Sequence, residues 1–233
     1  MFHFKQFSLS DEISAMKIGT DAVLLGAWVN CKNAQSILDI GTGTGIIALM
    51  MAQRTNALIK AVEISEDAAK EARCNVELSP WKNRVEIIQI AFQKYSDSNI
   101  QKFDLIISNP PFFSNSLKSA DPLRTISRHD EMLPFNELIK GAVKILNQDG
   151  HLNLILPTEN LDGKIKIAEI NGLFPIRICS VISREGKPAV RSMIEFRFIK
   201  PEAIHYESIS IRNRDGSYTD AYKLLTYEFY LGL

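Results

Sequence analysis

The sequence is poor in the residues that build cross-linked or metal-stabilised proteins. It contains only three cysteines among 233 residues, and no two of them form a C-x-x-C pair. Neither a disulfide framework nor a zinc knuckle is indicated, and we expect no metal site. The cysteines are expected to occupy positions of small apolar side chains. They are Cys31, Cys74 and Cys179.

A long hydrophobic run is missing as well. No stretch approaches the roughly 20 apolar residues of a membrane-spanning helix. The first twelve residues, MFHFKQFSLSDE, lack the basic and apolar regions of a signal peptide. We therefore expect a reduced, soluble, cytoplasmic protein without membrane association.

Neither sign of charge is in excess, because 27 Lys and Arg residues balance 27 Asp and Glu residues. This excludes a protein coated with basic residues, while a local basic patch balanced by acidic surface elsewhere remains compatible with it. The composition is that of a globular domain, with 45% hydrophobic and 23% charged residues. The length allows one large domain.

Short apolar runs alternate with helical patterns over most of the chain, which is typical of an α/β fold with a parallel sheet covered by helices. The expected strands are 36–40, 59–64, 84–90, 103–108 and 151–156. The expected helices between them are 46–54, 66–78 and 134–146. A helix is also expected before the first strand, capped by Thr20 and Asp21 and running to about Trp28.

The pattern changes in the C-terminal part. Segments 176–183 and 190–199 are β-rich and flank the turn REGKPA, so we expect a hairpin that closes the sheet in antiparallel fashion. A strand at 208–212 and a helix from about 219 to 230 are expected in the tail. We interpret 1–233 as a single domain. Its parts are a capping segment 1–30, a core 31–200 and a C-terminal strand and helix 201–233.

A glycine-rich loop follows the first core strand. Gly41, Gly43 and Gly45 stand between a strand and a helix, which suits close approach of a ligand to the backbone. Their G-x-G-x-G spacing differs from the G-x-G-x-x-G of dinucleotide sites, because Ile46 stands where the third glycine would be. Glu63 ends the next strand, where its carboxylate can accept hydrogen bonds from both hydroxyls of a ribose.

Loop and acid together indicate a nucleoside ligand without phosphates, and S-adenosylmethionine fits this description. Asp39, just before the loop, could hold the ammonium group of that cofactor. It could equally cap the amides of the loop itself.

The fourth core strand ends in Asn109-Pro110-Pro111-Phe112. The prolines hold Asn109 and Pro110 extended, which makes a stiff turn rich in hydrogen-bond acceptors. If the Asn109 side-chain oxygen and the Pro110 carbonyl each accept one N–H of an exocyclic amine, the lone pair of that nitrogen can point at a methyl donor. Phe112 would stack on the base. The turn also has a purely structural interpretation as a loop stiffener.

With these motifs the chain resembles the class I S-adenosylmethionine-dependent methyltransferases that methylate amino groups. The segment AMKIGTDAVLLGAW, residues 15–28, is more closely similar to the N-terminal signature of the bacterial tRNA(Val) adenosine N6-methyltransferase family. The resemblance covers nearly the whole chain. It implies a seven-stranded, mostly parallel Rossmann-like sheet, S-adenosylmethionine as cofactor, and a tRNA methylated on the adenosine 3′ of the anticodon.

The resemblance also implies roles for individual residues. Those expected beside the methionine half of the cofactor are Lys17, Gly19, Thr20 and Asp21. The segment from Asn109 to Phe112 would receive the adenine of the substrate, and Asn109 would also contact the cofactor. Such enzymes often have an acidic residue after the third strand, where this chain has Ala91. We expect Phe92 to pack on the adenine of the cofactor instead.

A basic hairpin is hidden in the neutral chain. Arg184, Lys187 and Arg191 surround its turn, where they could reach phosphates beside an adenosine extruded from a tRNA loop. A charged edge that prevents sheet-to-sheet pairing would give the same pattern. A second basic group follows Phe113 and consists of Lys118, Arg124, Arg128 and His129.

Other functions stay open at this point. The same turn could methylate guanine N2 in rRNA or a glutamine in a protein. A nicotinamide-dependent oxidoreductase is disfavoured by the position of the third glycine, and a non-catalytic RNA-binding protein by the intact Asn109 and Glu63. We expect a tRNA substrate, no obligate protein partner and a monomer.

Overall fold

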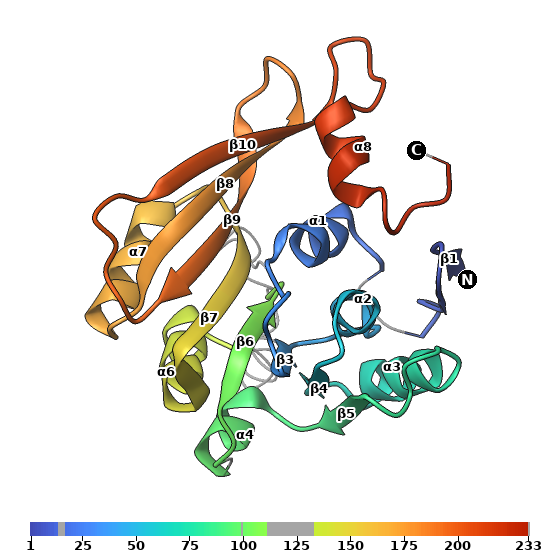
Figure 1. Ribbon diagram of the computed structural model, residues 1–233, viewed down its shortest axis with the longest axis vertical. Helices are drawn as coiled ribbons and strands as arrows, with labels where there is room; N and C mark the ends of the chain where they lie inside the picture. Colours follow the sequence, from blue (N-terminus) through green and yellow to red (C-terminus); the bar gives the residue numbers. More distant parts are fainter. Residues whose placement is uncertain (14–16, 99, 111–132, 233) are drawn as a thin grey trace, which may run out of the picture.

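An eight-stranded sheet forms the centre of the computed structural model, which describes residues 1–13, 17–98, 100–110 and 133–232 (Figure 1). The strand order is β10-β8-β9-β7-β6-β3-β4-β5. In chain order the strands are β3 (Ser36–Ile40), β4 (Leu58–Glu63), β5 (Val85–Gln89), β6 (Phe103–Ser108), β7 (Leu146–Pro157), β8 (Phe174–Arg184), β9 (Ala189–Arg197) and β10 (His205–Arg212). The α/β class expected from the alternating pattern is confirmed.

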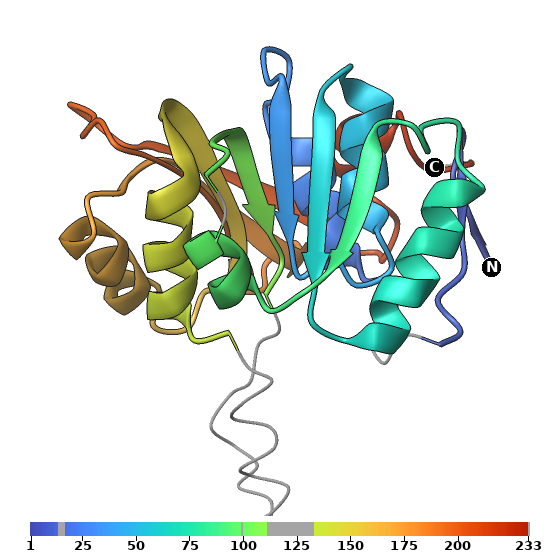
Figure 2. The ribbon, with the colours of Figure 1, turned by 90° about the horizontal axis from the view of Figure 1, so that it is seen from below.

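Helices cover both faces of the sheet (Figures 1 and 2). One face carries α1 (Thr20–Trp28), α2 (Ile46–Arg54), α3 (Glu66–Glu77) and α8 (Asp220–Thr226). The other carries α4 (Phe92–Ser98), α6 (Phe135–Ile145) and α7 (Leu161–Ile170). Successive strand residues point to opposite faces, so Ile37 belongs to the first core and Leu38 to the second.

A short two-stranded sheet of β1 (Phe2–His3) and β2 (Ser8–Leu9) lies near the end of the chain, where Phe4 pairs with Tyr230. Among the helices of the described ranges, none combines the length and apolar composition needed to cross a bilayer.

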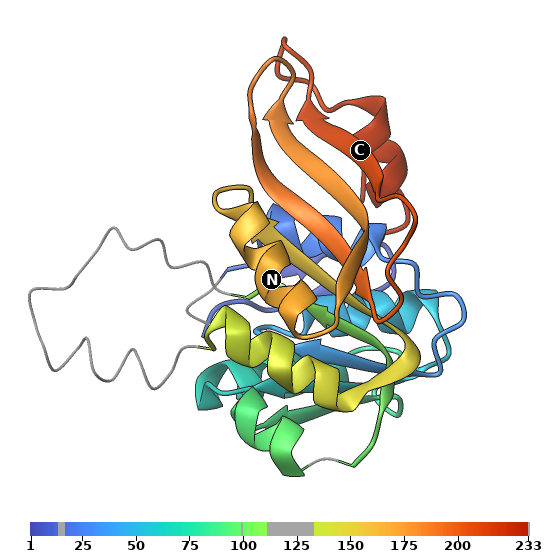
Figure 3. The ribbon, with the colours of Figure 1, turned by 90° about the vertical axis from the view of Figure 1, so that its left-hand side faces the viewer.

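The C-terminal strands correct the expected strand count. β8 and β9 form the expected antiparallel hairpin, and β9 also pairs antiparallel with β7. β10 then adds an eighth strand parallel to β8, with Arg212 opposite Arg184. Seven strands was therefore too few, because segment 205–212 continues the sheet along the free edge of β8. Figure 3 shows β8, β9 and β10 in orange and red rising together above the rest of the sheet, with α8 beside their upper ends.

Three smaller expectations were wrong. The N-cap of α1 is Gly19, which has no side chain to cap the helix; Thr20 is its first residue, and the Asp21 carboxylate pairs with Arg191 of β9. Cys74 is exposed, whereas Cys31 and Cys179 are buried. The helices α4 and α7 were not expected, since α4 spans only 7 residues and only Ala168 of α7 is buried.

The carboxyl ends of β3 and β6 meet where the strand order reverses. β4 and β5 follow β3 toward one edge of the sheet, whereas β6 and β7 lie on its other side. The Ser108 hydroxyl donates to the Ile40 carbonyl over 2.8 Å, which joins the last residues of the two strands. Such a switch point is where open α/β sheets bind ligands.

Candidate active site

The glycine loop begins at this switch point. Gly41, Gly43 and Gly45 have φ angles of 69°, 56° and 85°, which side chains with a Cβ rarely adopt. A Cβ on Gly41 or Gly43 would meet nothing within 4 Å, whereas one on Gly45 would lie 3.5 Å from Ala72 of α3. The first two glycines therefore leave open space over the loop, and the third lets α2 start close to α3.

Asp39 lies below the loop with no exposed surface. Its Oδ2 accepts a 2.5 Å hydrogen bond from the Thr42 hydroxyl, while Oδ1 is buried without a partner among the described residues. Burial raises the pKa of this carboxyl to about 7. The Thr42 bond fits the loop-capping interpretation for one oxygen, and the other oxygen has no hydrogen-bond donor among the described residues.

Glu63 closes the opposite side of the loop. Its Oε2 accepts from the Gly43 amide over 2.9 Å and its Oε1 from the Ser65 amide over 3.0 Å. The carboxylate is therefore oriented by the backbone on both sides, and each oxygen retains acceptor capacity for a hydroxyl. Ile64 follows it directly and is 41% exposed, so it offers an apolar surface beside the site.

The N-terminal segment is fastened over this region by Asn75 of α3. The Asn75 amide donates to the Ser10 carbonyl and the Thr44 carbonyl, both over 2.9 Å, and accepts from the Ser10 amide over 2.8 Å. One buried side chain thus joins the N-terminal segment to the glycine loop. Sequence reasoning missed Asn75, because no local motif distinguishes it from a surface asparagine.

Replacing Asn75 with alanine is expected to lower the free energy of unfolding by about 2 to 4 kcal/mol, because buried backbone groups of Ser10 and Thr44 lose their partners. Urea denaturation measures this change. Asn83→Ala, at an exposed position just after the same helix, serves as the matched control. Equal stabilities of the two variants would contradict the bridging role.

Lys17 and Thr20, expected beside the cofactor, are both exposed at the start of α1. The Lys17 ammonium donates to the Asp11 carbonyl, and the Ile18 amide donates to the Asp11 carboxylate over 3.2 Å. These bonds fold the segment before α1 on itself. Lys17 and Thr20 thus lie within the capping segment with exposed side chains, and the Lys17 ammonium bonds to the backbone of that segment.

Asn109 and Pro110 follow β6 at the same edge. Ile40, the last residue of β3, pairs with Ser108, the last residue of β6. The glycine loop after β3 and the proline turn after β6 therefore start side by side, on neighbouring strands about 5 Å apart. Asn109 Oδ1 is buried and has no hydrogen-bond partner among the described residues. A buried acceptor without a donor costs free energy. Pro111 and Phe112 lie outside the described residues, as do Lys118, Arg124, Arg128 and His129.

Phe92 does not join this site. Its side chain is 4% exposed and packs in the core against α6, where a Cβ on Gly141 would lie 2.5 Å from its ring. The residue begins α4, which turns the ring inward under the sheet. The expected stacking of Phe92 on an adenine therefore has no support in its position.

The basic residues of the hairpin lie at its two opposite ends. Arg184 and Lys187 are exposed at its turn, whereas Arg177 lies near the start of β8 and pairs with Glu207 over 2.8 Å. Arg191 stands at the start of β9 and its Nε contacts the Asp21 carboxylate at 2.8 Å. The Arg191 guanidinium thus holds the first turn of α1 against the sheet.

The geometry combines an open glycine loop with two buried acceptor oxygens, Asp39 Oδ1 and Asn109 Oδ1, that have no donor within the described ranges. These features fit a ligand that carries a ribose, an ammonium group and no phosphate, as S-adenosylmethionine does. Within the described ranges, no three His, Cys, Asp or Glu side chains gather closely enough to hold a metal ion.

Curated relatives match the chain along its full length. A tRNA1(Val) (adenine(37)-N6)-methyltransferase of Bacteroides fragilis is 43% identical over 231 residues, covering 99% of this chain and 97% of the relative. Enzymes of the same name from Trichodesmium erythraeum and Pseudoalteromonas translucida are 42% and 41% identical, each over 99% of this chain and over 97% and 98% of their own lengths.

Solved structures share the fold at lower identity. The crystal structure of a predicted O-methyltransferase from Agrobacterium tumefaciens aligns with a TM-score of 0.68 at 22% identity, over 90% of this chain and 96% of that one. The ribosomal protein L11 methylase of Lactobacillus delbrueckii subsp. bulgaricus aligns with a TM-score of 0.56 at 16% identity, over 81% and 82%. The methyltransferase small domain family matches residues 13–172. The resemblance noted in the sequence is thus confirmed, and the chain belongs to the methyltransferase small domain family and, within it, to the tRNA1(Val) (adenine(37)-N6)-methyltransferases.

Proposed function

We propose that this protein methylates N6 of the adenosine at position 37 of tRNA1(Val), using S-adenosylmethionine. The curated relatives carry this activity in their names, at up to 43% identity over nearly the whole chain. The observation that carries the proposal is the buried Asn109 Oδ1, which has no partner among the described residues and stands one strand from the glycine loop.

The cofactor would lie over the glycine loop. Gly41 and Gly43 leave room for it, Glu63 would accept the ribose hydroxyls, and Asp39 Oδ1 would accept from the ammonium group. Ile64 would contact the adenine in place of Phe92. Lys17 and Thr20 would cover the methionine half through the capping segment. S-adenosylmethionine supplies an electrophilic methyl group when bound.

Asn109 and Pro110 orient the nucleophile. An adenine N6 amine has two N–H donors and a lone pair delocalised into the ring, which makes it a weak nucleophile. When Asn109 Oδ1 and the Pro110 carbonyl each accept one N–H, the nitrogen moves toward tetrahedral geometry and its lone pair becomes available. Phe112 would stack on the base and hold it in this position. No strong base is needed, since the proton leaves after the nitrogen becomes cationic.

The RNA would approach across the carboxyl edge of the sheet. Arg184 and Lys187 are exposed there and suit contact with phosphates. Arg191 would support this surface by holding α1. Lys118, Arg124 and Arg128 would add further contacts from the segment after the proline turn.

Nucleoside mass spectrometry of tRNA1(Val) incubated with the protein and isotope-labelled S-adenosylmethionine tests the proposal. We expect labelled N6-methyladenosine at position 37 and none in a transcript with guanosine at that position. Label in 2-methylguanosine of rRNA, or in a protein glutamine, with none in tRNA adenosine would overturn the substrate assignment.

A further inference from the structure

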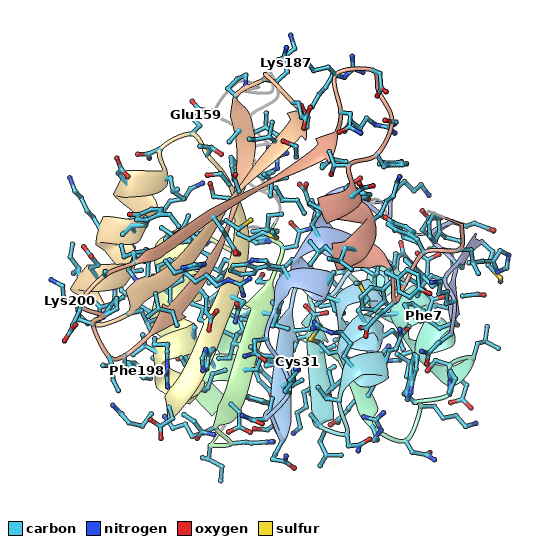
Figure 4. All side chains as sticks on the ribbon, turned by 45° about the horizontal axis from the view of Figure 1, so that its top comes forward. Phe7, Cys31, Glu159, Lys187, Phe198 and Lys200 are labelled. Carbon is cyan, nitrogen blue, oxygen red and sulfur yellow. The ribbon has the colours of Figure 1, made fainter. Side chains whose placement is uncertain are left out.

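Two turns stand side by side at the far end of the sheet. β8 ends at Arg184 and β10 ends at Arg212, and these two residues are paired in the parallel ladder. The backbone amide of Glu185 also donates to the Arg212 carbonyl over 2.9 Å. Figure 4 shows Lys187 at the tip of the hairpin, directed away from the sheet, with the turn after β10 beside it. The turns 184–188 and 212–217 therefore form one continuous surface.

This surface lies on the same edge of the sheet as the candidate active site. β9 is antiparallel to both β7 and β8, so β8 runs in the direction of β7, and β10 is parallel to β8. β6 is parallel to β7 as well. The carboxyl ends of β6, β8 and β10 therefore all lie at the same end of the sheet, and the twist of the sheet turns β8 and β10 relative to β6.

The distance between the two places follows from the register. β8 is three strands from β6, which is about 15 Å across the sheet. Ser108 is level with Ile178 through Leu154 and Ile194, so Arg184 extends about 15 to 20 Å beyond the end of β6. The resulting separation of about 20 to 25 Å corresponds to about six stacked nucleotides of one strand.

An arginine side chain of each turn lies against the glycine of the other turn. A Cβ on Gly186 of the first turn would lie 3.9 Å from Nε of Arg214, and a Cβ on Gly216 of the second turn would lie 3.9 Å from Nη2 of Arg184. Both glycines have positive φ angles, 80° and 93°, which keep these positions free of side chains. The two guanidinium groups thus lie across the pair of turns.

The charges of this surface are not neutralised within it. Arg184, Lys187 and Arg214 are exposed, and none of them forms an ion pair with another described residue. The nearby Asp215 carboxylate instead accepts from the amide and hydroxyl of Ser217, over 2.9 and 2.6 Å. The two turns carry four cationic side chains, Arg184, Lys187, Arg212 and Arg214, against the carboxylates of Glu185 and Asp215, so positive charge is in excess. Such an excess favours an anionic ligand, and guanidinium groups match phosphate oxygens in geometry.

The second turn has a rigid support. Arg212 donates to the Gly216 carbonyl over 2.7 Å and to the Tyr218 hydroxyl over 3.0 Å, and its guanidinium lies 4.2 Å from the centre of the Tyr218 ring. The backbone amide of Asn213 donates to the Ser217 carbonyl over 2.8 Å, and this bond closes the turn. Arg212 is therefore used in folding the turn, and Arg214 is left free to contact a ligand.

We propose that Arg184, Lys187 and Arg214 form a two-turn clamp that binds RNA backbone phosphates of the tRNA arm, several nucleotides away from the base held at Asn109. This inference rests on the proposed function, since it takes tRNA as the substrate. Arg191 is not part of the clamp, because Asp21 already pairs with it. The clamp makes binding depend on the structured arm and not only on the target loop.

Binding of tRNA1(Val) and of a short single strand that carries only the target adenosine and a few neighbours tests the clamp. We expect Arg184→Glu and Arg214→Glu each to weaken tRNA binding at least about tenfold, and to reduce the slope of log affinity against log salt by about one per lost phosphate contact. Binding of the short strand is expected to stay within about twofold of the wild type.

Lys200→Glu is the matched control. Lys200 is exposed and follows the last residue of β9, so it lies at the end of the hairpin opposite the turn 184–188. Thermal unfolding checks each fold, and Arg214→Gln tests the same position without charge reversal. Unchanged tRNA affinity and salt slope in the Arg184 and Arg214 variants, an equal loss in Lys200→Glu, or an equal loss on the short strand would overturn the clamp. A wild type that binds tRNA without methylating it would instead refute the proposed function, while the binding comparison still judges the clamp.

Discussion

Replacing Asn109 with alanine is expected to lower the rate of tRNA methylation by about 10²- to 10³-fold, the size of effect found when one preorganised polar contact to a reacting group is removed. The Asn109 oxygen is buried without a donor among the described residues, so it is already placed to receive one. Because the interaction orients the nucleophile, the loss should fall mainly on kcat.

Single-turnover kinetics with saturating tRNA separates this effect from binding. Asn109→Asp keeps an acceptor oxygen at the same position and replaces the amide N–H donors by a second acceptor oxygen with a negative charge, so it should retain more activity than Asn109→Ala. The dissociation constant of S-adenosylmethionine, measured by calorimetry, should change less than the methylation rate in both variants. Equal loss in the alanine and aspartate variants would show that the acceptor oxygen is not what the reaction needs.

Much of the site could be predicted from the sequence because its parts are local. Gly41, Gly43 and Gly45 need positive φ angles whatever surrounds them, and Glu63 ends a strand that must lie next to theirs in a parallel sheet. The order of strands then brings Asn109 to the same edge. Each of these inferences depends only on a short segment and on the regular geometry of α/β folds.

The features that could not be predicted depend on distant partners. Asn75 lies 65 residues from Ser10 and Arg191 lies 170 residues from Asp21, so no motif announces either pair. Phe92 follows a strand near the expected cofactor, yet the helix that starts there directs its ring into the core. The pairing of β10 with β8 also depends on distant segments, so the sequence did not predict which strand β10 would join. The position of Arg214, just after β10, could not be predicted either.

A second large effect is expected at Asp39. Asp39→Asn should stabilise the ligand-free protein, and the gain should be about 2 to 3 kcal/mol larger at pH 8 than at pH 5. Burial raises the pKa of Asp39 to about 7, above its value of 3.8 in an unperturbed chain. Asparagine fills the same space, can accept the Thr42 hydroxyl bond, and does not titrate.

The sign follows from the protons bound in each state. Between about pH 4 and pH 7 the folded protein keeps a proton on Asp39 that the unfolded chain has lost. Stability therefore falls as pH rises through this window, and it levels off above the folded pKa. Thermal unfolding at pH 5 and pH 8 measures this change. The melting temperature of Asp39→Asn minus that of the wild type should be about 5 to 10 °C larger at pH 8 than at pH 5.

Asp104→Asn provides a control of opposite character. Burial of Asp104 acts to raise its pKa, but hydrogen bonds from Gln35, Asn147 and Ser36 outweigh it and lower the pKa below the usual value. Its contribution to stability is present above about pH 4, so Asp104→Asn should destabilise equally at pH 5 and pH 8. A pH-independent difference for Asp39→Asn as well would contradict the titration assigned to Asp39.

Asp39→Asn should at the same time weaken the binding of S-adenosylmethionine at pH 8 by at least about tenfold, because an ionised Asp39 Oδ1 is lost as the acceptor for the ammonium group. In the wild type, binding should tighten as pH rises toward 8, since ionising Asp39 becomes easier. Calorimetry at both pH values measures this, and in the variant the affinity should vary less with pH. A variant that is more stable yet binds as tightly as the wild type would show that Asp39 only shapes the loop.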